Sequence, residues 1–169
     1  MTGLHTGHTP VRGNTEHRPE GQAPMPADTF TVAKHLQDAG YRTGIIGKWG
    51  LGYPGSASDP LRMGFARFYG YNCQRMAHCY FPAFLWNDDQ RQLLWGNVGS
   101  HHRDYAPDLI QAEALKFIRE NHEHPFFCYY AAIQPHADMV APETYMQKYR
   151  GKYLPEVNYP ADHYAAQPE

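Results

Sequence analysis

The sequence predicts an α/β protein with a doubly wound, mostly parallel sheet that is only partly present and is flanked by helices. Two segments support this prediction. In residues 29–47 a helical pattern passes through a glycine into a short apolar strand, and in residues 105–133 a longer helical pattern leads into a second apolar strand. The chain also has 15 glycines and 14 prolines, which predicts many loops between short elements.

The first αβ unit begins with a helix over residues 29–39, which Asp28 or Thr29 can cap and which Gly40 ends. A short buried strand over residues 41–47 follows directly. A helix, a glycine turn and a strand in this order form one unit of a doubly wound sheet. The apolar residues of the helix recur at helical spacing: Val32, Leu36 and Ala39.

The remaining segments before residue 100 are shorter and rich in turn formers. Residues 1–28 carry few large apolar side chains and are predicted to be an irregular, largely exposed lead segment. Residues 48–64 are predicted to be a loop, and residues 65–71 an aromatic strand. Residues 80–95 resemble a β-hairpin, with a turn made of Asn87, Asp88 and Asp89.

The second αβ unit is the clearest part of the pattern. A helix is predicted over residues 105–122, with Pro107 and Asp108 in its first turn. The strand PFFCYYAAI, residues 125–133, is nearly all apolar, which is typical of a strand buried on both faces. The helix has one apolar stripe: Ile110, Ala114, Phe117 and Ile118.

Composition excludes several classes of protein. Lys plus Arg is 15 and Asp plus Glu is 17, with no basic block, so the sequence does not predict a nucleic-acid binder. No apolar run is long enough to span a membrane, and residues 1–10 do not have the pattern of a signal peptide. The three cysteines are expected to be unbridged thiols, although the spacing of Cys73 and Cys79 permits one disulfide.

Two chargeable residues follow the two predicted strands. Lys48 comes directly after the strand of residues 41–47, and His136 follows the strand of residues 125–133. Open α/β sheets bind their ligands beyond the carboxyl ends of their strands. The pattern therefore predicts a functional site that contains Lys48 and His136.

Three segments resemble the sulfatase family, within the alkaline-phosphatase-like fold. Residues 1–14, MTGLHTGHTPVRGN, resemble the stretch that follows the family's nucleophile motif. Residues 39–52, AGYRTGIIGKWGLG, resemble its Gly-Lys-Trp block, and residues 124–142 resemble the strand that ends in Pro-His. The order and spacing match as well, with GFARFYGYN at residues 64–72 between them. The resemblance implies that residues 1–169 are a fragment of a catalytic domain, with αβ units over residues 29–169 and a hairpin near residues 80–95.

The resemblance gives the two strand-end residues catalytic roles. A sulfate ester is negatively charged and its leaving oxygen gains charge, so Lys48 can hold a sulfate oxygen and His136 can donate to one or protonate the leaving alcohol. His78, in QRMAHCYFP, resembles a family histidine that lines the substrate pocket; the alternative is an ordinary hydrogen-bonded histidine under the hairpin. Many family members carry histidine where this chain has Gly50.

The resemblance also implies a formylglycine nucleophile and a calcium ion. None of the three cysteines stands in the nucleophile motif, so the modified residue is expected upstream of this chain. The calcium ligands are likewise expected elsewhere in the parent enzyme, because Asp88-Asp89 has the pattern of a hairpin turn. Histidine clusters that could bind zinc are not expected to converge: His5 with His8, His101 with His102, and His122 with His124.

The full-length parent is therefore expected to hydrolyse sulfate esters of a small molecule or glycan, outside the cytoplasm in periplasm, lysosome or medium. The isolated chain is expected to be inactive and only marginally stable, because its sheet would have open edges. Two alternatives stay open. One is a non-catalytic module that binds anions or sulfated glycans, and the other is a phosphodiesterase or phosphonate hydrolase of the same superfamily.

Overall fold

The computed structural model describes residues 1–99, 101–136 and 139–152, and its centre is a five-stranded sheet in the order β4-β3-β2-β1-β5. β1 pairs in parallel with both β2 and β5, whereas β3 pairs antiparallel with β2 and with β4. The α/β fold with helices flanking a partial sheet is confirmed. The strands are β1 Arg42–Lys48, β2 Arg67–Tyr71, β3 Phe84–Asn87, β4 Gln90–Leu93 and β5 Phe126–Ala131.

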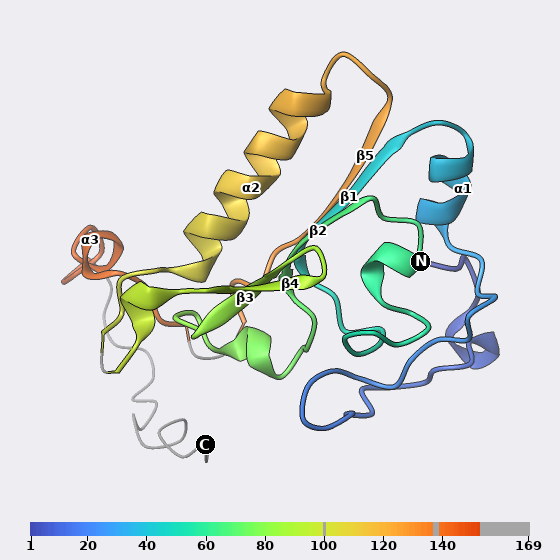
Figure 1. Ribbon diagram of the computed structural model, residues 1–169. Helices are drawn as coiled ribbons and strands as arrows, with labels where there is room; N and C mark the ends of the chain where they lie inside the picture. The colour runs from blue at the N-terminus through green and yellow to red at the C-terminus, as the bar shows by residue number, and fades with distance from the viewer. Residues whose placement is uncertain (100, 137–138, 153–169) are drawn as a thin grey trace.

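Helices cover both faces of the sheet, as a doubly wound fold requires. α1 (Val32–Asp38) and α2 (Ala106–Asn121) lie on opposite sides of β1 and β5 (Figure 1). A short helix α3, Glu143–Met146, follows β5. Within the described residues, 3-10 helices lie in the lead segment (η1 Thr6–His8) and in the connections between strands and helices (η2 Pro60–Arg62, η3 Met76–His78 and η4 Trp95–Asn97).

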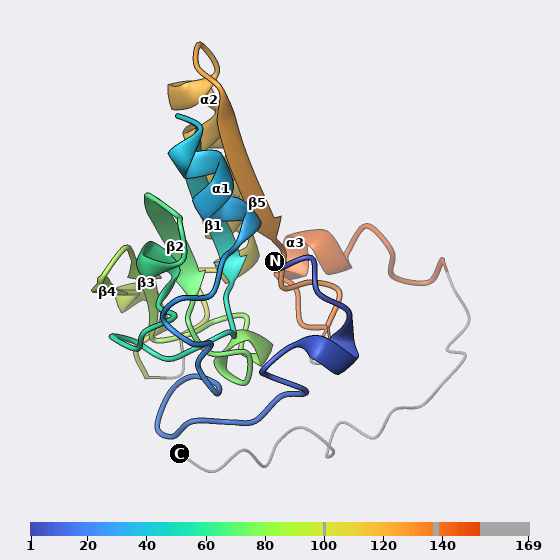
Figure 2. The same cartoon turned by 90° about the vertical axis from the view of Figure 1, so that its right-hand side faces the viewer.

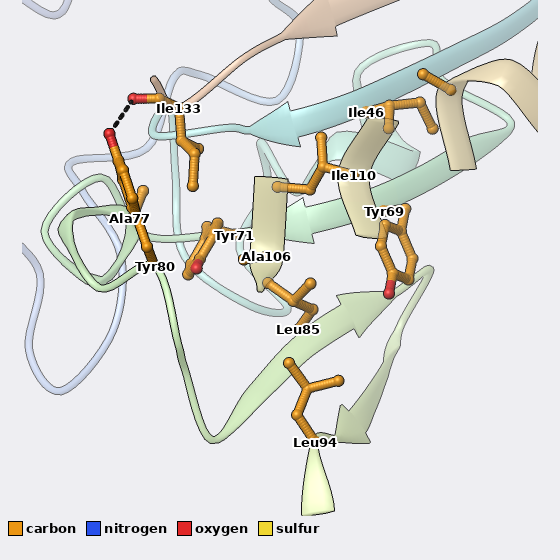
Figure 3. Close-up of a cluster of buried hydrophobic side chains, with 11 residues drawn as sticks. Ile46, Tyr69, Tyr71, Ala77, Tyr80, Leu85, Leu94, Ala106, Ile110 and Ile133 are labelled. Carbon is orange, nitrogen blue, oxygen red and sulfur yellow. Dashed lines mark hydrogen bonds between the residues drawn. The ribbon is translucent and has the colours of Figure 1, made fainter. Parts of the chain in front are cut away.

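The two faces carry separate hydrophobic cores, because successive side chains of a strand point to opposite sides. Ile46 belongs to the core under α2, and its neighbour Ile45 to the core under α1. Both isoleucines have no exposed surface. Figure 3 shows the α2 core, in which Ile46 of β1 and Ile110 of α2 lie between the sheet and the helix. Burial of this apolar surface is the main force that holds the layers together.

The first helix begins later than the sequence predicts. Its N-cap is Thr31, not Asp28 or Thr29, and the Thr31 hydroxyl oxygen accepts from the Lys34 backbone N–H at 3.1 Å. The same hydroxyl donates to the carbonyl of Met63 at 2.7 Å. This tertiary bond selects Thr31 among the available caps, which local sequence could not reveal. The helix does end before Gly40, as predicted.

The lead segment is irregular as predicted, but it is not exposed throughout. Glu20 and Gln22 are buried, and so is Met25. The Glu20 carboxylate accepts from the Trp86 indole N–H at 2.6 Å and pairs with Arg91 at 3.0 Å. The lead segment therefore packs against the hairpin, and it curls beneath the carboxyl ends of β1 and β5 (Figure 2). A buried carboxylate needs such partners, and these lie far away in the sequence.

Two predicted buried surfaces are partly exposed. Ile118 of the α2 stripe is 38% exposed, whereas Ile110 and Phe117 are buried. In β5, predicted to be buried on both faces, Tyr129 and Tyr130 are 40% and 43% exposed. The reason is position: within the described residues β5 pairs only with β1 and forms the edge of the sheet. An apolar strand at an open edge is a site for further pairing.

The hairpin prediction is confirmed, and the Asp88 carboxylate is part of its structure. Asp88 lies in the turn between β3 and β4 with φ +55°. Its carboxylate accepts from the Phe68 backbone N–H at 2.8 Å and pairs with Arg67 at 2.9 Å. Burial alone would lower the pKa of Arg67, but the bonds to Glu113 and Asp88 raise it overall. The carboxylate thus joins the hairpin turn to β2.

Asp88→Ala is expected to lower the free energy of unfolding by about 1–3 kcal/mol, because it leaves the Phe68 backbone N–H without its acceptor and removes one of the two carboxylates that pair with Arg67. Asp89→Ala is the matched control, since Asp89 is exposed in the same turn, and it should change stability by less than about 0.5 kcal/mol. Denaturant unfolding of the full-length protein measures both values. Equal effects of the two substitutions would contradict this role of Asp88.

The cysteines, all three within the described residues, form no disulfide, which confirms the expectation of unbridged thiols. Cys73 is buried, Cys79 is exposed and Cys128 is half-buried. Burial raises the pKa of the Cys128 thiol. In the described ranges no helix has the length and apolar character needed to cross a membrane.

Candidate functional site

Lys48 is the last residue of β1, at the carboxyl end of the parallel strands. It pairs in register with Tyr71, the last residue of β2. The backbone ladder continues one step further, because the Trp49 N–H donates to the Tyr71 carbonyl at 2.8 Å. The Trp49 ring is buried in the α1 core, and its indole N–H donates to the Ser58 carbonyl at 2.9 Å. Lys48 is therefore half-buried between a fixed strand and an anchored tryptophan.

His136 lies in the turn after β5, at the same end of the sheet as Lys48. Its ring is exposed, but its backbone is held, because the Tyr80 hydroxyl donates to the carbonyls of His136 at 3.1 Å and Ile133 at 3.5 Å. Tyr80 is only 4% exposed, and Figure 3 shows its bond to Ile133. The loop that carries His136 is thus anchored to the buried core beside it.

The structure brings two of the predicted site residues, His78 and His136, into contact with each other. The rings of His78 and His136 are stacked, with centroids 4.3 Å apart and planes 18° apart. His78 ends η3 in the connection between β2 and β3, far from β5 in the sequence. The two histidines meet because β1 lies between β2 and β5, which places the carboxyl ends of all three strands at one edge of the sheet.

Gly50 departs from the histidine of many sulfatases, and the structure gives a steric reason for glycine. Its φ is +90°, which disfavours any residue with a Cβ. A Cβ on Gly50 would lie 2.3 Å from Cγ of Gln74 and 2.5 Å from its Nε2. The side chain of Gln74 therefore occupies the space that a side chain at position 50 would need.

Sequence reasoning missed Asn72 and Gln74, which lie just beyond the carboxyl end of β2, next to the strand that ends at Lys48. Asn72 is 1% exposed, and its backbone carbonyl accepts from the Gly50 N–H at 3.2 Å. Its side-chain oxygen is the one buried side-chain polar atom in the described ranges without a hydrogen-bond partner. Such an atom is costly unless it serves a role. The available signal was the strand-end rule itself, which we applied to the strands at residues 41–47 and 125–133 but not to residues 65–71.

The part of the chain that the structure describes does not supply a calcium or zinc site. No three metal-ligating side chains converge among these residues. Asp88 is committed to Phe68 and Arg67, and His101 and His102 are exposed. Hard cations need several oxygen ligands from separate segments, and the described residues do not fit that requirement.

The fold and the site together define a class. This is an open α/β sheet with helices on both faces, and its polar strand-end residues gather at the carboxyl edge where such proteins bind their ligands. Comparison with known proteins gives the family: the Sulfatase family model matches residues 1–166. The chain belongs to the sulfatase family.

Named relatives agree with this assignment. The chain is 32% identical to an arylsulfatase of Hemicentrotus pulcherrimus over 172 residues, which cover 88% of this chain and 30% of the relative. It is 27% identical to human N-acetylgalactosamine-6-sulfatase, covering 89% of this chain and 32% of that protein. The chain thus spans about a third of the length of these two relatives.

Solved structures show the same fold. BT4656, solved in complex with its substrate D-glucosamine-2-N,6-O-disulfate, is 26% identical with a TM-score of 0.59 over 80% of this chain and 25% of that one. Ps i-CgsB has a TM-score of 0.65 at 23% identity, over 81% of this chain and 33% of its own, and supports the fold alone.

Proposed function

We propose that the full-length protein hydrolyses sulfate esters, and that Lys48 and His136 contact the sulfate group. The observation that carries this proposal is their shared position: in a member of the sulfatase family, both residues lie at the carboxyl ends of two parallel strands that pair with each other, β1 and β5. Lys48 is half-buried there, and charges near a protein surface attract each other more strongly than they do in bulk water.

The two side chains divide the work by their chemistry. The Lys48 ammonium is a compact cation that attracts a sulfate oxygen and keeps its charge while the S–O bond to the alcohol breaks. The His136 imidazole can donate a hydrogen bond to a second sulfate oxygen, or pass a proton to the leaving oxygen as it gains negative charge. A histidine with an exposed ring at a strand end can reach a bound ester in this way.

For the complete enzyme we also propose a formylglycine residue and a calcium ion, with the modified residue and the calcium ligands in parts of the protein other than this chain. They would supply the nucleophile and a further positive charge. The substrate we propose is a sulfated small molecule or glycan, and the sugar disulfate bound by BT4656 favours a carbohydrate. We place the complete protein in periplasm, lysosome or medium.

Sulfate release by the full-length protein tests the proposal. It should liberate sulfate from a sulfated glucosamine or an aryl sulfate at least about 100-fold faster than it cleaves the matching phosphodiester to a phosphomonoester and an alcohol. The reason is that contacts made in the transition state favour one of the two transferred groups. A preference for the phosphodiester would identify a phosphodiesterase instead. Binding of the sulfated sugar without turnover would identify a non-catalytic module.

A further inference from the structure

The connection between β2 and β3 carries a second imidazole to the site, as the stack of His78 on His136 shows. Parallel aromatic rings with centroids 4.3 Å apart are in van der Waals contact. An exposed imidazole on a loop would otherwise rotate about its side-chain bonds. The His78 ring therefore restricts the orientation of the His136 ring.

The segment that carries His78 is itself well anchored. Ala77, directly before it, is 2% exposed in the α2 core. Directly after it, the Cys79 carbonyl accepts a 2.5 Å hydrogen bond from the Tyr71 hydroxyl, and burial raises the pKa of that phenol, so it stays protonated and able to donate. Tyr80 then holds the His136 carbonyl. Residues 77–80 thus fix both the ring and the backbone of His136.

The path of this connection depends on Gly50. The Gln74 side chain fills the space beside Gly50, so a residue with a Cβ there would push the connection away from the sheet. The Gln74 backbone N–H is held from the other side by the Gln22 side-chain oxygen at 3.1 Å. Glycine at position 50 therefore permits the close approach of the connection that carries His78.

We propose that His78 is a positioning residue for His136, and that the β2–β3 connection, which glycine at position 50 allows to approach the sheet, holds the His78 ring against the His136 ring. This inference rests on the sulfate-ester hydrolysis proposed above. In this role His78 affects the reaction by orienting the His136 ring. His78 also borders a polar pocket of about 130 Å³, which is small beside the roughly 300–1,000 Å³ of sites that enclose a whole ligand.

Kinetics of His78 variants in the full-length protein test the role. His78→Ala should lower kcat for a sulfate ester about 10- to 100-fold, because a misoriented His136 is poorly placed for the reaction, while KM changes less than about threefold. His78→Phe keeps a flat ring that can stack and should recover most of kcat. His124→Ala, at an exposed turn after α2, is the control and should match the wild type.

A spectroscopic measurement separates this inference from the proposed function. In protein labelled with ¹³C at histidine rings, His78→Ala should move the His136 ring resonances downfield as the ring current of the stack is lost, and His78→Phe should leave them near their wild-type positions. This readout does not require turnover. An inactive wild type that shows these shifts would overturn the sulfatase proposal but retain the stack. An active wild type in which His78→Ala leaves kcat and the His136 resonances unchanged, or in which His78→Phe is no better than His78→Ala, would overturn the positioning role.

Discussion

Lys48→Ala in the full-length protein is expected to lower kcat/KM for a sulfate ester roughly 10²–10³-fold. Removal of one preorganised donor that stabilises charge in the transition state typically lowers the rate by about this factor. A water molecule that fills the space of the lysine does not carry its positive charge. The effect is expected to be specific to this position. Lys48 ends a buried strand beside the anchored Trp49, so its backbone is held in place at the carboxyl end of β1. Steady-state kinetics with a single sulfated substrate gives the ratio directly.

Two further variants separate charge from bulk effects. Lys48→Arg keeps the charge but spreads it over a planar guanidinium, so it should recover only part of the loss. Lys116→Ala removes an exposed lysine of α2 that lies 3.7 Å from Glu113, and such surface pairs contribute little. If Lys48→Ala and Lys116→Ala retained equal activity, Lys48 would not belong to the sulfate site.

Gly47→Ala is expected to destabilise the fold strongly, with a loss of about 2–5 kcal/mol in the free energy of unfolding. Gly47 lies in the centre of the sheet, where it pairs with Gly70 on one side and Ala131 on the other. Its φ is +127°, and a Cβ there would lie 1.9 Å from the carbonyl oxygen of Ala131. Backbone of a neighbouring strand cannot move aside as a flexible side chain can.

Gly40→Ala is the matched control for this substitution. Gly40 also has positive φ, +86°, but a Cβ there would have no atom within 4 Å. It should therefore cost only the backbone strain, about 1–2 kcal/mol. Thermal melts of the full-length variants measure both effects. Equal destabilisation would show that the contact with Ala131 does not control the packing of β1 against β5.

The sequence predicted those parts of the fold where local and global preferences agree. Gly40 ended the first helix because a residue with positive φ is needed there. Pro107 and Asp108 marked the start of α2, and the Asp88 turn marked the hairpin. The start of α1 could not be predicted in the same way, because a tertiary bond to Met63 selected Thr31 as the cap.

Burial was harder to predict than element type. The apolar run of β5 reads as a strand covered on both faces, yet Tyr129 and Tyr130 are exposed in the described structure because only β1 pairs with it. Conversely, Glu20 in a turn-rich segment is buried, because residues from another part of the chain satisfy its carboxylate: the Trp86 indole N–H donates to it and Arg91 pairs with its charge. Neither outcome leaves a signal in the local pattern.

The sequence by itself determined the α/β class and the family resemblance, and it marked Lys48 and His136 as strand-end residues. These are properties of local periodicity and motif order. Only the tertiary structure decided that His78 stacks on His136 and that Gln74 fills the space beside Gly50. The physical reason is strand order: β1 lies between β2 and β5, so loops distant in the sequence meet at one edge of the sheet.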